Sequence, residues 1–212
     1  DIRKTGYAIL VEGYMDLLQL YQAGIKPVVS VSGTSLTKNH ANLISKHVKK
    51  AILLYDGDSA GANAVLRAGF ILLQFGVEAY VVRPPDKLDP DDWLLKKGFD
   101  SLKKAIKSPM EFLDFHLEFY NAKKLRGVQK RDYLHEIIGN IKTINDSIIK
   151  NEIIRNLSEK MRMHEIELLQ ILNLKRNYNN SEIVNVENNL FKFKTKLQRA
   201  ELELIKIMIN SN

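Results

Sequence analysis

Two aspartates separated by a single glycine are the residues of this sequence best suited to chemistry. Asp56 and Asp58 directly follow the apolar run Ala51–Tyr55, which is too short for a helix and predicts a buried strand. Gly57 allows a sharp backbone turn between them. Carboxylates spaced in this way are hard oxygen ligands that can share one Mg²⁺ or a pair of ions. The spacing therefore predicts a metal site, although most such Asp-Gly dipeptides are surface turns followed by a helix cap.

Four further acids follow short apolar runs in the same half of the chain. Glu12 ends the run Tyr7–Val11, and Asp16 lies about one helical turn further on. Asp89 and Asp91 lie in a proline-stiffened loop that follows another apolar run. Hardly any Lys or Arg is adjacent to these acids in sequence, so no network of ion pairs is expected around them. Carboxylates gathered in this way repel one another unless a cation holds them, and a divalent ion is the simplest candidate.

Alternating strands and helices are expected to position these acids. The apolar runs predict four strands, and the segments between them have the spacing of amphipathic helices. Short right-handed connections then give an α/β domain with a parallel sheet covered by helices on both faces. The carboxyl ends of parallel strands lie along one edge, so the acids are expected to converge there. The four expected strands are residues 7–11, 28–31, 51–55 and 77–82.

Helix caps offer a second use for the same residues. We expect Ser59 to cap the helix that follows Asp58. Pro90 suits a first helical turn, and one of Asp91 and Asp92 is expected to cap the helix that follows. Capping by one acid does not prevent another from binding a metal ion.

The chain beyond residue 100 has helical spacing throughout and no grouping of catalytic residues. We expect an α/β catalytic domain at residues 1–100 and a helical subdomain at 101–175. An Asn-rich linker is expected at 176–189, followed at 190–212 by a terminal amphipathic helix.

Bulk composition limits the class of protein. The 212 residues carry a net charge of +7, which suits a polyanionic partner, although many solvated helices are equally basic. The absence of cysteine excludes disulfides and thiolate zinc sites, and it fits a reducing, cytoplasmic compartment. No apolar run is long enough to span a membrane. The first residue is Asp1 rather than methionine, which suggests a piece of a longer protein.

Three motifs carry a resemblance to a known family. They are Glu-Gly-Tyr-Met-Asp at 12–16, Tyr-Asp-Gly-Asp-Ser-Ala-Gly at 55–61 and Asp-Pro-Asp at 89–91. Together they resemble the Toprim domain of topoisomerases, primases and some nucleases. Their order and spacing are most similar to those of bacterial-type replicative DNA primases. The resemblance covers roughly residues 6–100, and the helical remainder resembles the end of a primase polymerase core.

The resemblance implies synthesis of RNA primers from NTPs on a single-stranded DNA template, with two or more Mg²⁺ or Mn²⁺ ions and no zinc in this chain. It also implies a replicative helicase as partner of the region beginning near residue 190. Family members carry a zinc-binding domain and a basic subdomain before Toprim, so this chain alone is expected to be poorly active. The implied catalytic residues are Glu12, Asp56 and Asp58, and the implied metal-binding residues are Glu12, Asp16, Asp56, Asp58, Asp89 and Asp91.

Two alternatives remain at this point. A Toprim nuclease would use similar ions to activate water instead of a ribose hydroxyl. A non-catalytic module that docks a helicase through its helical half would need no metal chemistry. A topoisomerase is disfavoured, because no accompanying domain with a candidate tyrosine nucleophile is visible.

Overall fold

A five-stranded sheet and its covering helices form the first part of the chain. The computed structural model describes residues 2–32 and 35–177, with side chains described up to residue 172. The strands are β1 (Tyr7–Val11), β2 (Val28–Ser30), β3 (Lys50–Leu53), β4 (Glu78–Val81) and β5 (Met110–Glu111). The helices among them are α1 (Ile2–Thr5), α2 (Tyr14–Gln22), α3 (Lys38–Ser45), α4 (Ser59–Gln74), α5 (Pro90–Lys97) and α6 (Phe99–Lys107).

The strand order is β2-β1-β3-β4-β5, and the first four strands are parallel. This confirms the predicted α/β class and the four predicted strands. β5 was not predicted: it pairs antiparallel with β4, where Glu111 lies opposite Tyr80. A two-residue strand is too short for alternating polarity to reveal it.

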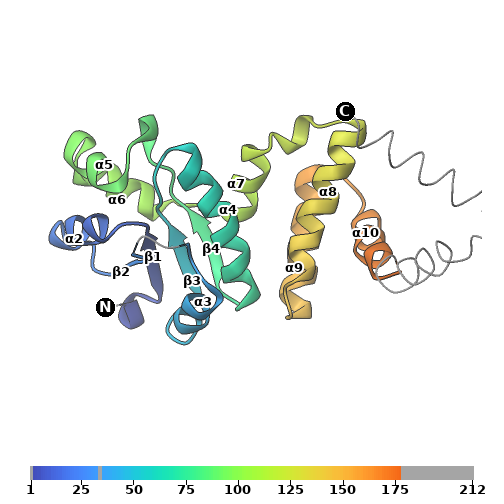
Figure 1. The fold of residues 1–212 in the computed structure, drawn as a ribbon, viewed down its shortest axis with the longest axis horizontal. Helices are drawn as coiled ribbons and strands as arrows, with labels where there is room; N and C mark the ends of the chain where they lie inside the picture. Colours follow the sequence, from blue (N-terminus) through green and yellow to red (C-terminus); the bar gives the residue numbers. More distant parts are fainter. Residues whose placement is uncertain (1, 33–34, 178–212) are drawn as a thin grey trace, which may run out of the picture. The chain divides into compact units, whose positions relative to one another are not determined.

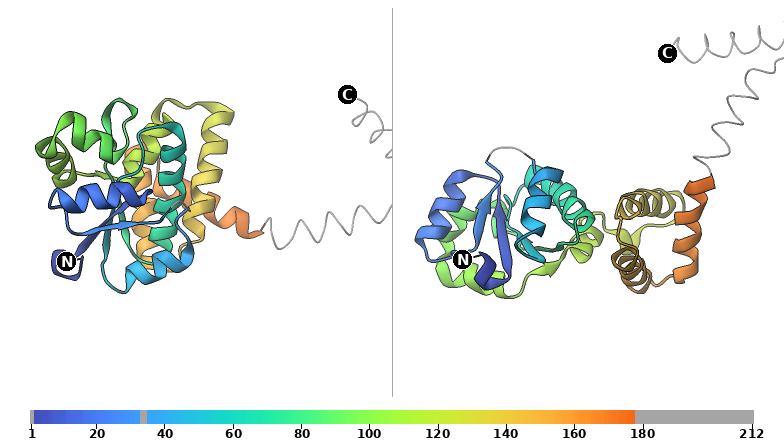
Figure 2. Two further views of the ribbon diagram at one scale, coloured as in Figure 1. Left: turned by 60° about the vertical axis from the view of Figure 1, so that its left-hand side comes forward. Right: turned by 90° about the horizontal axis from the view of Figure 1, so that it is seen from below.

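Helices cover both faces of the sheet (Figures 1 and 2). On one face, Ile9 and Ile52 pack in a core with Leu20 of α2, Trp93 of α5 and Leu102 of α6. The other face is covered by α3, α4 and α7 (Phe112–Phe119). Because successive strand residues point to opposite faces, both faces of the central strands must be apolar. This explains why β1 and β3 are apolar runs rather than alternating ones.

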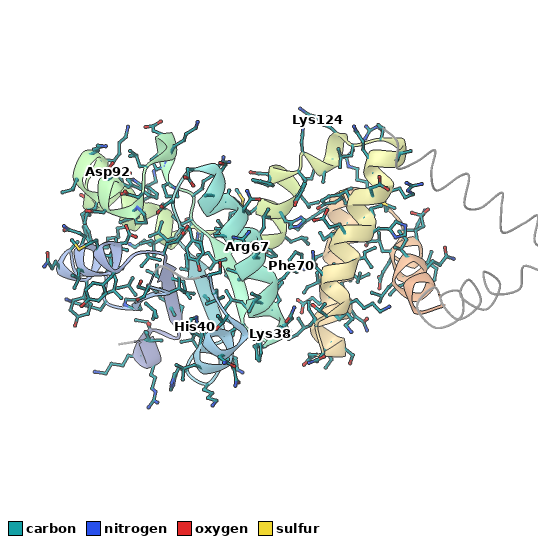
Figure 3. The ribbon with its side chains drawn as sticks, viewed as in Figure 1. Lys38, His40, Arg67, Phe70, Asp92 and Lys124 are labelled. Atoms are coloured by element: carbon teal, nitrogen blue, oxygen red, sulfur yellow. The ribbon has the colours of Figure 1, made fainter. Side chains whose placement is uncertain are left out.

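The later helices continue the first compact unit, which comprises residues 1–168; residues 169–212 form the second. In the first unit, α8 (Gly127–Lys142) packs beside α9 (Ser147–Met161), whereas α10 (Glu165–Asn177) spans the boundary. Phe70 of α4, labelled in Figure 3, meets the Phe112 ring of α7 edge-on with 5.0 Å between centroids.

The expected boundaries at residues 100 and 175 stay predictions. The expected linker and terminal helix lie outside the described residues, apart from the last two positions of α10. No helix in the described part of the chain is long and apolar enough to cross a bilayer.

Candidate metal-binding active site

Two acids meet where the central strands end. β1 and β3 are neighbours, with Leu10 opposite Leu53, so residues just beyond both strands lie close together. Glu12 and Asp56 occupy those positions, and the Asp56 backbone amide is close enough to the Glu12 carboxylate to oppose the rise in its pKa. The predicted convergence at the carboxyl edge therefore holds for these two residues.

Asp16 and the acidic loop before α5 join the same cluster. Asp16 is buried, and its Oδ2 accepts a hydrogen bond from the Gly13 backbone N–H at 3.0 Å. Its carboxylate is close enough to Asp89 and Asp91 to be affected by their charges. Contact between α2 and α5 creates this proximity between residues more than 70 positions apart.

A main-chain hydrogen bond joins the two loops that carry the aspartate pairs. The Gly57 backbone N–H donates to the Leu88 carbonyl at 2.8 Å. A Cβ at Gly57 would lie 2.9 Å from both that carbonyl oxygen and the Cα of Lys87, so no larger residue fits without moving a loop. This close approach brings Asp56 near enough to Asp89 for the two charges to interact.

Two of the predicted metal-binding acids also cap helices. Asp58 Oδ1 accepts the Gly61 backbone N–H at 2.7 Å and caps α4. Asp89 Oδ1 accepts the Asp92 backbone N–H at 2.6 Å and caps α5. The predicted cap at Ser59 was therefore wrong by one position. The expectation that Asp91 or Asp92 caps α5 was wrong as well, because Asp89 precedes Pro90 and has the extended backbone that a cap requires.

Substitutions at Asp58 separate the cap from metal binding. We expect Asp58→Asn to keep the cap and the free energy of unfolding but to weaken Mn²⁺ binding at least about tenfold, because the ligand loses its charge. Asp58→Ala should also lower the free energy of unfolding by about 1 kcal/mol, because the cap is lost. Urea unfolding and calorimetric Mn²⁺ titration measure the two effects. Unchanged Mn²⁺ affinity in Asp58→Asn would reduce Asp58 to a helix cap.

The cluster is negative and lacks compensating ion pairs. Within the described residues, none of the six predicted acids forms a salt bridge, whereas the neighbouring Asp86 and Asp92 pair with Lys97 and Lys96 at 2.9 and 2.6 Å. Asp92 is labelled in Figure 3. Burial and the neighbouring carboxylates raise the pKa of Glu12, of Asp16 and of Asp91. The same causes raise the pKa of Asp56 to about 6.

Unpartnered oxygen atoms test whether a divalent cation fits here. In the described part of the chain, Glu12 Oε1 and Asp91 Oδ1 are buried without a hydrogen-bond partner. Anionic oxygens without partners are costly unless a cation or a proton compensates them. Among the described residues no three acidic or histidine side chains are arranged to enclose an ion. Asp16, Asp58 and Asp89 each accept a hydrogen bond from a backbone N–H. The donor set nevertheless fits a hard divalent cation, with each of these three carboxylates keeping a second oxygen.

The raised pKa of Asp56 predicts how stability depends on pH without metal. Asp56 releases its proton near pH 6 in the folded chain and near pH 4 when unfolded, so the folded state binds more protons between these values. The free energy of unfolding should therefore fall as pH rises from about 4 to 6, by about 1 kcal/mol after allowance for solvent screening. Asp56→Asn should reduce this slope in EDTA-treated protein, measured by urea unfolding at several pH values. An unchanged slope would contradict the assignment.

Sequence reasoning missed two residues beside these acids. The Tyr55 hydroxyl is buried and has no partner in the described part of the chain, and burial together with the charge of Glu12 raises the Tyr55 pKa. Its place as the last apolar residue before Asp56 was the available signal. Arg67 of α4, labelled in Figure 3, is the cation whose charge opposes the rise in the Glu12 pKa. No sequence motif marked Arg67.

The fold and this acidic edge define a Toprim-type α/β domain, and residues 9–94 match the family described as Toprim-like. A DNA primase of Clostridium acetobutylicum is 32% identical over 187 residues, which are 85% of this chain and 31% of that protein. The chain belongs to the DnaG-type DNA primases and corresponds to their Toprim domain with the adjoining part of the catalytic core.

Solved structures agree with this assignment. The zinc-binding and RNA polymerase domains of the Aquifex aeolicus primase superpose with a TM-score of 0.67 at 36% identity, covering 80% of this chain and 40% of that one. A DnaG primase catalytic domain bound to single-stranded DNA gives a TM-score of 0.65 at 25% identity, covering 76% and 53%. The chain spans about a third or less of the length of the first curated relatives that it matches.

Proposed function

We propose that this chain forms the nucleotidyl-transfer centre of a DNA primase, which joins NTPs into short RNA primers on a single-stranded DNA template. One observation carries the proposal: acids from three separate segments converge at the carboxyl edge of a primase-like Toprim sheet, with buried carboxylate oxygens left without partners. The DNA-bound relative supports the choice of template.

We assign the residues the following roles. Glu12 would accept the proton of the attacking 3′ hydroxyl or bind a metal ion, since its raised pKa makes it a better base than an exposed carboxylate. Asp56 and Asp58 would bind metal at the end of β3, and Asp89 and Asp91 would do so from the loop before α5. Asp16 would orient this loop from α2, where it is buried against the cluster.

The cofactor we propose is Mg²⁺ or Mn²⁺, at two or more sites among these carboxylates. Bound there, the ions would neutralise phosphate charge and lower the pKa of the attacking hydroxyl. The chain itself supplies a rigid edge: the Gly57–Leu88 hydrogen bond and the caps at Asp58 and Asp89 fix the backbone that carries the ligands. Positioning of this kind accounts for much of the rate of phosphoryl transfer.

Other parts of a primase must hold the template. An acidic edge repels the DNA backbone, so a basic surface elsewhere has to bind it. The Aquifex aeolicus structure is more than half composed of chain with no counterpart here. We therefore expect the 212-residue chain alone to bind metal yet to make few primers. A replicative helicase stays the proposed partner of residues from about 190 onward, which lie outside the described part.

The test is a primer-synthesis assay with labelled NTPs, single-stranded DNA and Mg²⁺ or Mn²⁺. It compares the 212-residue chain with the full polypeptide that carries this sequence. Template-dependent RNA synthesis by the full polypeptide, lost on chelation, supports the proposal. Metal-dependent cleavage of DNA with no synthesis would replace it by a Toprim nuclease. Absence of both activities, with helicase binding retained, would leave a docking module.

A further inference from the structure

The hydroxyl of Tyr55 is a buried polar group that has no role in the proposed nucleotidyl transfer. The residue is only 2% exposed, and its hydroxyl has no hydrogen-bond partner in the described part of the chain. Burying such a hydroxyl costs free energy that the ring of a phenylalanine would not cost. A use for the hydroxyl would explain why this position holds a tyrosine.

The neighbouring carboxylate of Glu12 has an unpartnered oxygen as well, because Oε1 is buried without a hydrogen-bond partner among the described residues. β1 and β3 pair in parallel, with Leu10 opposite Leu53. The Leu54 backbone N–H donates to the Leu10 carbonyl at 2.9 Å, so the two segments stay paired just beyond the end of β3. Two positions further along each segment, Glu12 and Tyr55 are therefore neighbours.

The two side chains also lie on the same face of the sheet. The residues just before them, Val11 and Leu54, belong to the core that α2, α5 and α6 cover. Because successive side chains of an extended segment point to opposite faces, Glu12 and Tyr55 point to the face that α4 covers. The negative charge of Glu12 raises the Tyr55 pKa, which requires the two groups to be close. The hydroxyl and the carboxylate therefore share one buried environment.

No other described side chain supplies Glu12 Oε1 with a hydrogen bond. Asp16 and Asp58 act on Glu12 as like charges, and an ionised carboxylate cannot donate. Arg67 opposes the rise in the Glu12 pKa, but it is exposed and forms no ion pair with a described residue. Since neither unpartnered atom has a direct partner, one water between the Tyr55 hydroxyl and Oε1 would give each a hydrogen bond, as buried waters commonly do.

We propose that Tyr55 is a positioning residue whose hydroxyl donates through one bridging water to Glu12 Oε1 and so fixes the orientation of that carboxylate. Tyr55 would act on the reaction only through Glu12. Its effect on catalysis therefore rests on the proposed role of Glu12 in nucleotidyl transfer. The link between the two side chains, in contrast, belongs to the folded chain without metal and is tested there.

The first test is urea unfolding of the 212-residue chain in EDTA, with Tyr55→Phe as the variant. If the hydroxyl holds Glu12, its removal leaves Oε1 without a donor, and the unfolding midpoint should fall by about 0.5 M urea. If the hydroxyl is merely unpartnered, its removal relieves a buried polar group, and the midpoint should rise or stay constant. A rise or no change overturns the proposal.

A double-mutant cycle shows whether the lost stability comes from Glu12. In a Glu12→Ala background, Tyr55→Phe should change the midpoint by less than about 0.1 M urea, because the hydroxyl no longer has an acceptor. Asp16→Asn is the matched control background, since Asp16 belongs to the same acidic cluster but lies on α2. There the fall of about 0.5 M should persist. Equal falls in both backgrounds would overturn the proposal, because they would reflect ring packing alone.

Primer synthesis by the full polypeptide separates positioning from substrate binding. Tyr55→Phe should lower kcat about three- to tenfold and leave the KM for NTPs within about twofold, because a misplaced Glu12 affects the reacting group rather than binding. In a Glu12→Gln background it should cause no further loss. A raised KM with unchanged kcat would overturn the positioning role. If the full polypeptide makes no primers at all, the proposed function fails, whereas the unfolding cycle still decides the link.

Discussion

Replacing Glu12 with glutamine in the full polypeptide is expected to lower the rate of primer synthesis by about a hundredfold to ten-thousandfold. The change keeps the shape of the side chain but removes its negative charge and its ability to accept a proton. Glu12 follows the central strand β1, has one buried oxygen without a partner in the described residues and contacts the Asp56 backbone. The Glu12 carboxylate could therefore affect the reaction both as a proton acceptor and as a metal ligand.

The controls for Glu12→Gln separate catalysis from folding and template binding. Its free energy of unfolding should rise or stay constant, because removing a charge relieves repulsion from Asp16 and Asp58. Binding of single-stranded DNA should change less than twofold, since phosphate contacts come from basic residues. Glu78→Gln, an exposed glutamate at the other end of the strands, should leave the rate of synthesis unchanged. A Glu12→Gln rate within a few-fold of the original would make Glu12 structural.

Adding one methyl group at Gly61 should destabilise the chain, by about 1–3 kcal/mol. Gly61 lies in the first turn of α4, where glycine to alanine would ordinarily stabilise a helix by up to about 1 kcal/mol. Here the new Cβ would overlap the backbone carbonyl of Asp56, which cannot rotate away as a side chain can. A decrease in the free energy of unfolding, instead of the increase that is usual for glycine to alanine in a helix, is therefore the diagnostic result. Urea unfolding measures it.

Gly61→Ala should also weaken Mn²⁺ binding, because Asp56 has to move before the methyl group fits. Asn63→Ala is the matched control on the exposed side of the same helix turn, where only a hydrogen bond to the Ser59 carbonyl is lost. Its free energy of unfolding should change by less than about 0.5 kcal/mol. A higher free energy of unfolding in Gly61→Ala would contradict this prediction, because it would show that the loop before α4 moves at little cost.

The sheet and most of the acidic edge were predictable because local pattern and topology suffice for them. Apolar runs define buried strands, and parallel pairing sends Glu12 and Asp56 to one edge whatever the loops do. The acids themselves were visible through their position after each run. The sequence did not predict which carboxylates cap helices. Asp and Ser are equally good caps, and whether Asp58 or Ser59 caps α4 depends on the residue at which the helix begins.

Other features arise only from tertiary contact. Nothing local to Gly57 reveals that it meets the Leu88 carbonyl, and nothing local to Asp16 reveals its burial beside α5. Such encounters depend on how helices pack across a sheet, which no single window of sequence contains.

The order β2-β1-β3-β4 affects how the chain folds while it is being synthesised on the ribosome. β1 is made early, yet its partner β3 emerges some 40 residues later, and the loop that carries Asp91 later still. The acidic cluster around Glu12 therefore stays incomplete until that loop has left the exit tunnel. Metal binding by stalled nascent chains of increasing length should appear abruptly rather than gradually, once this last segment is free to fold.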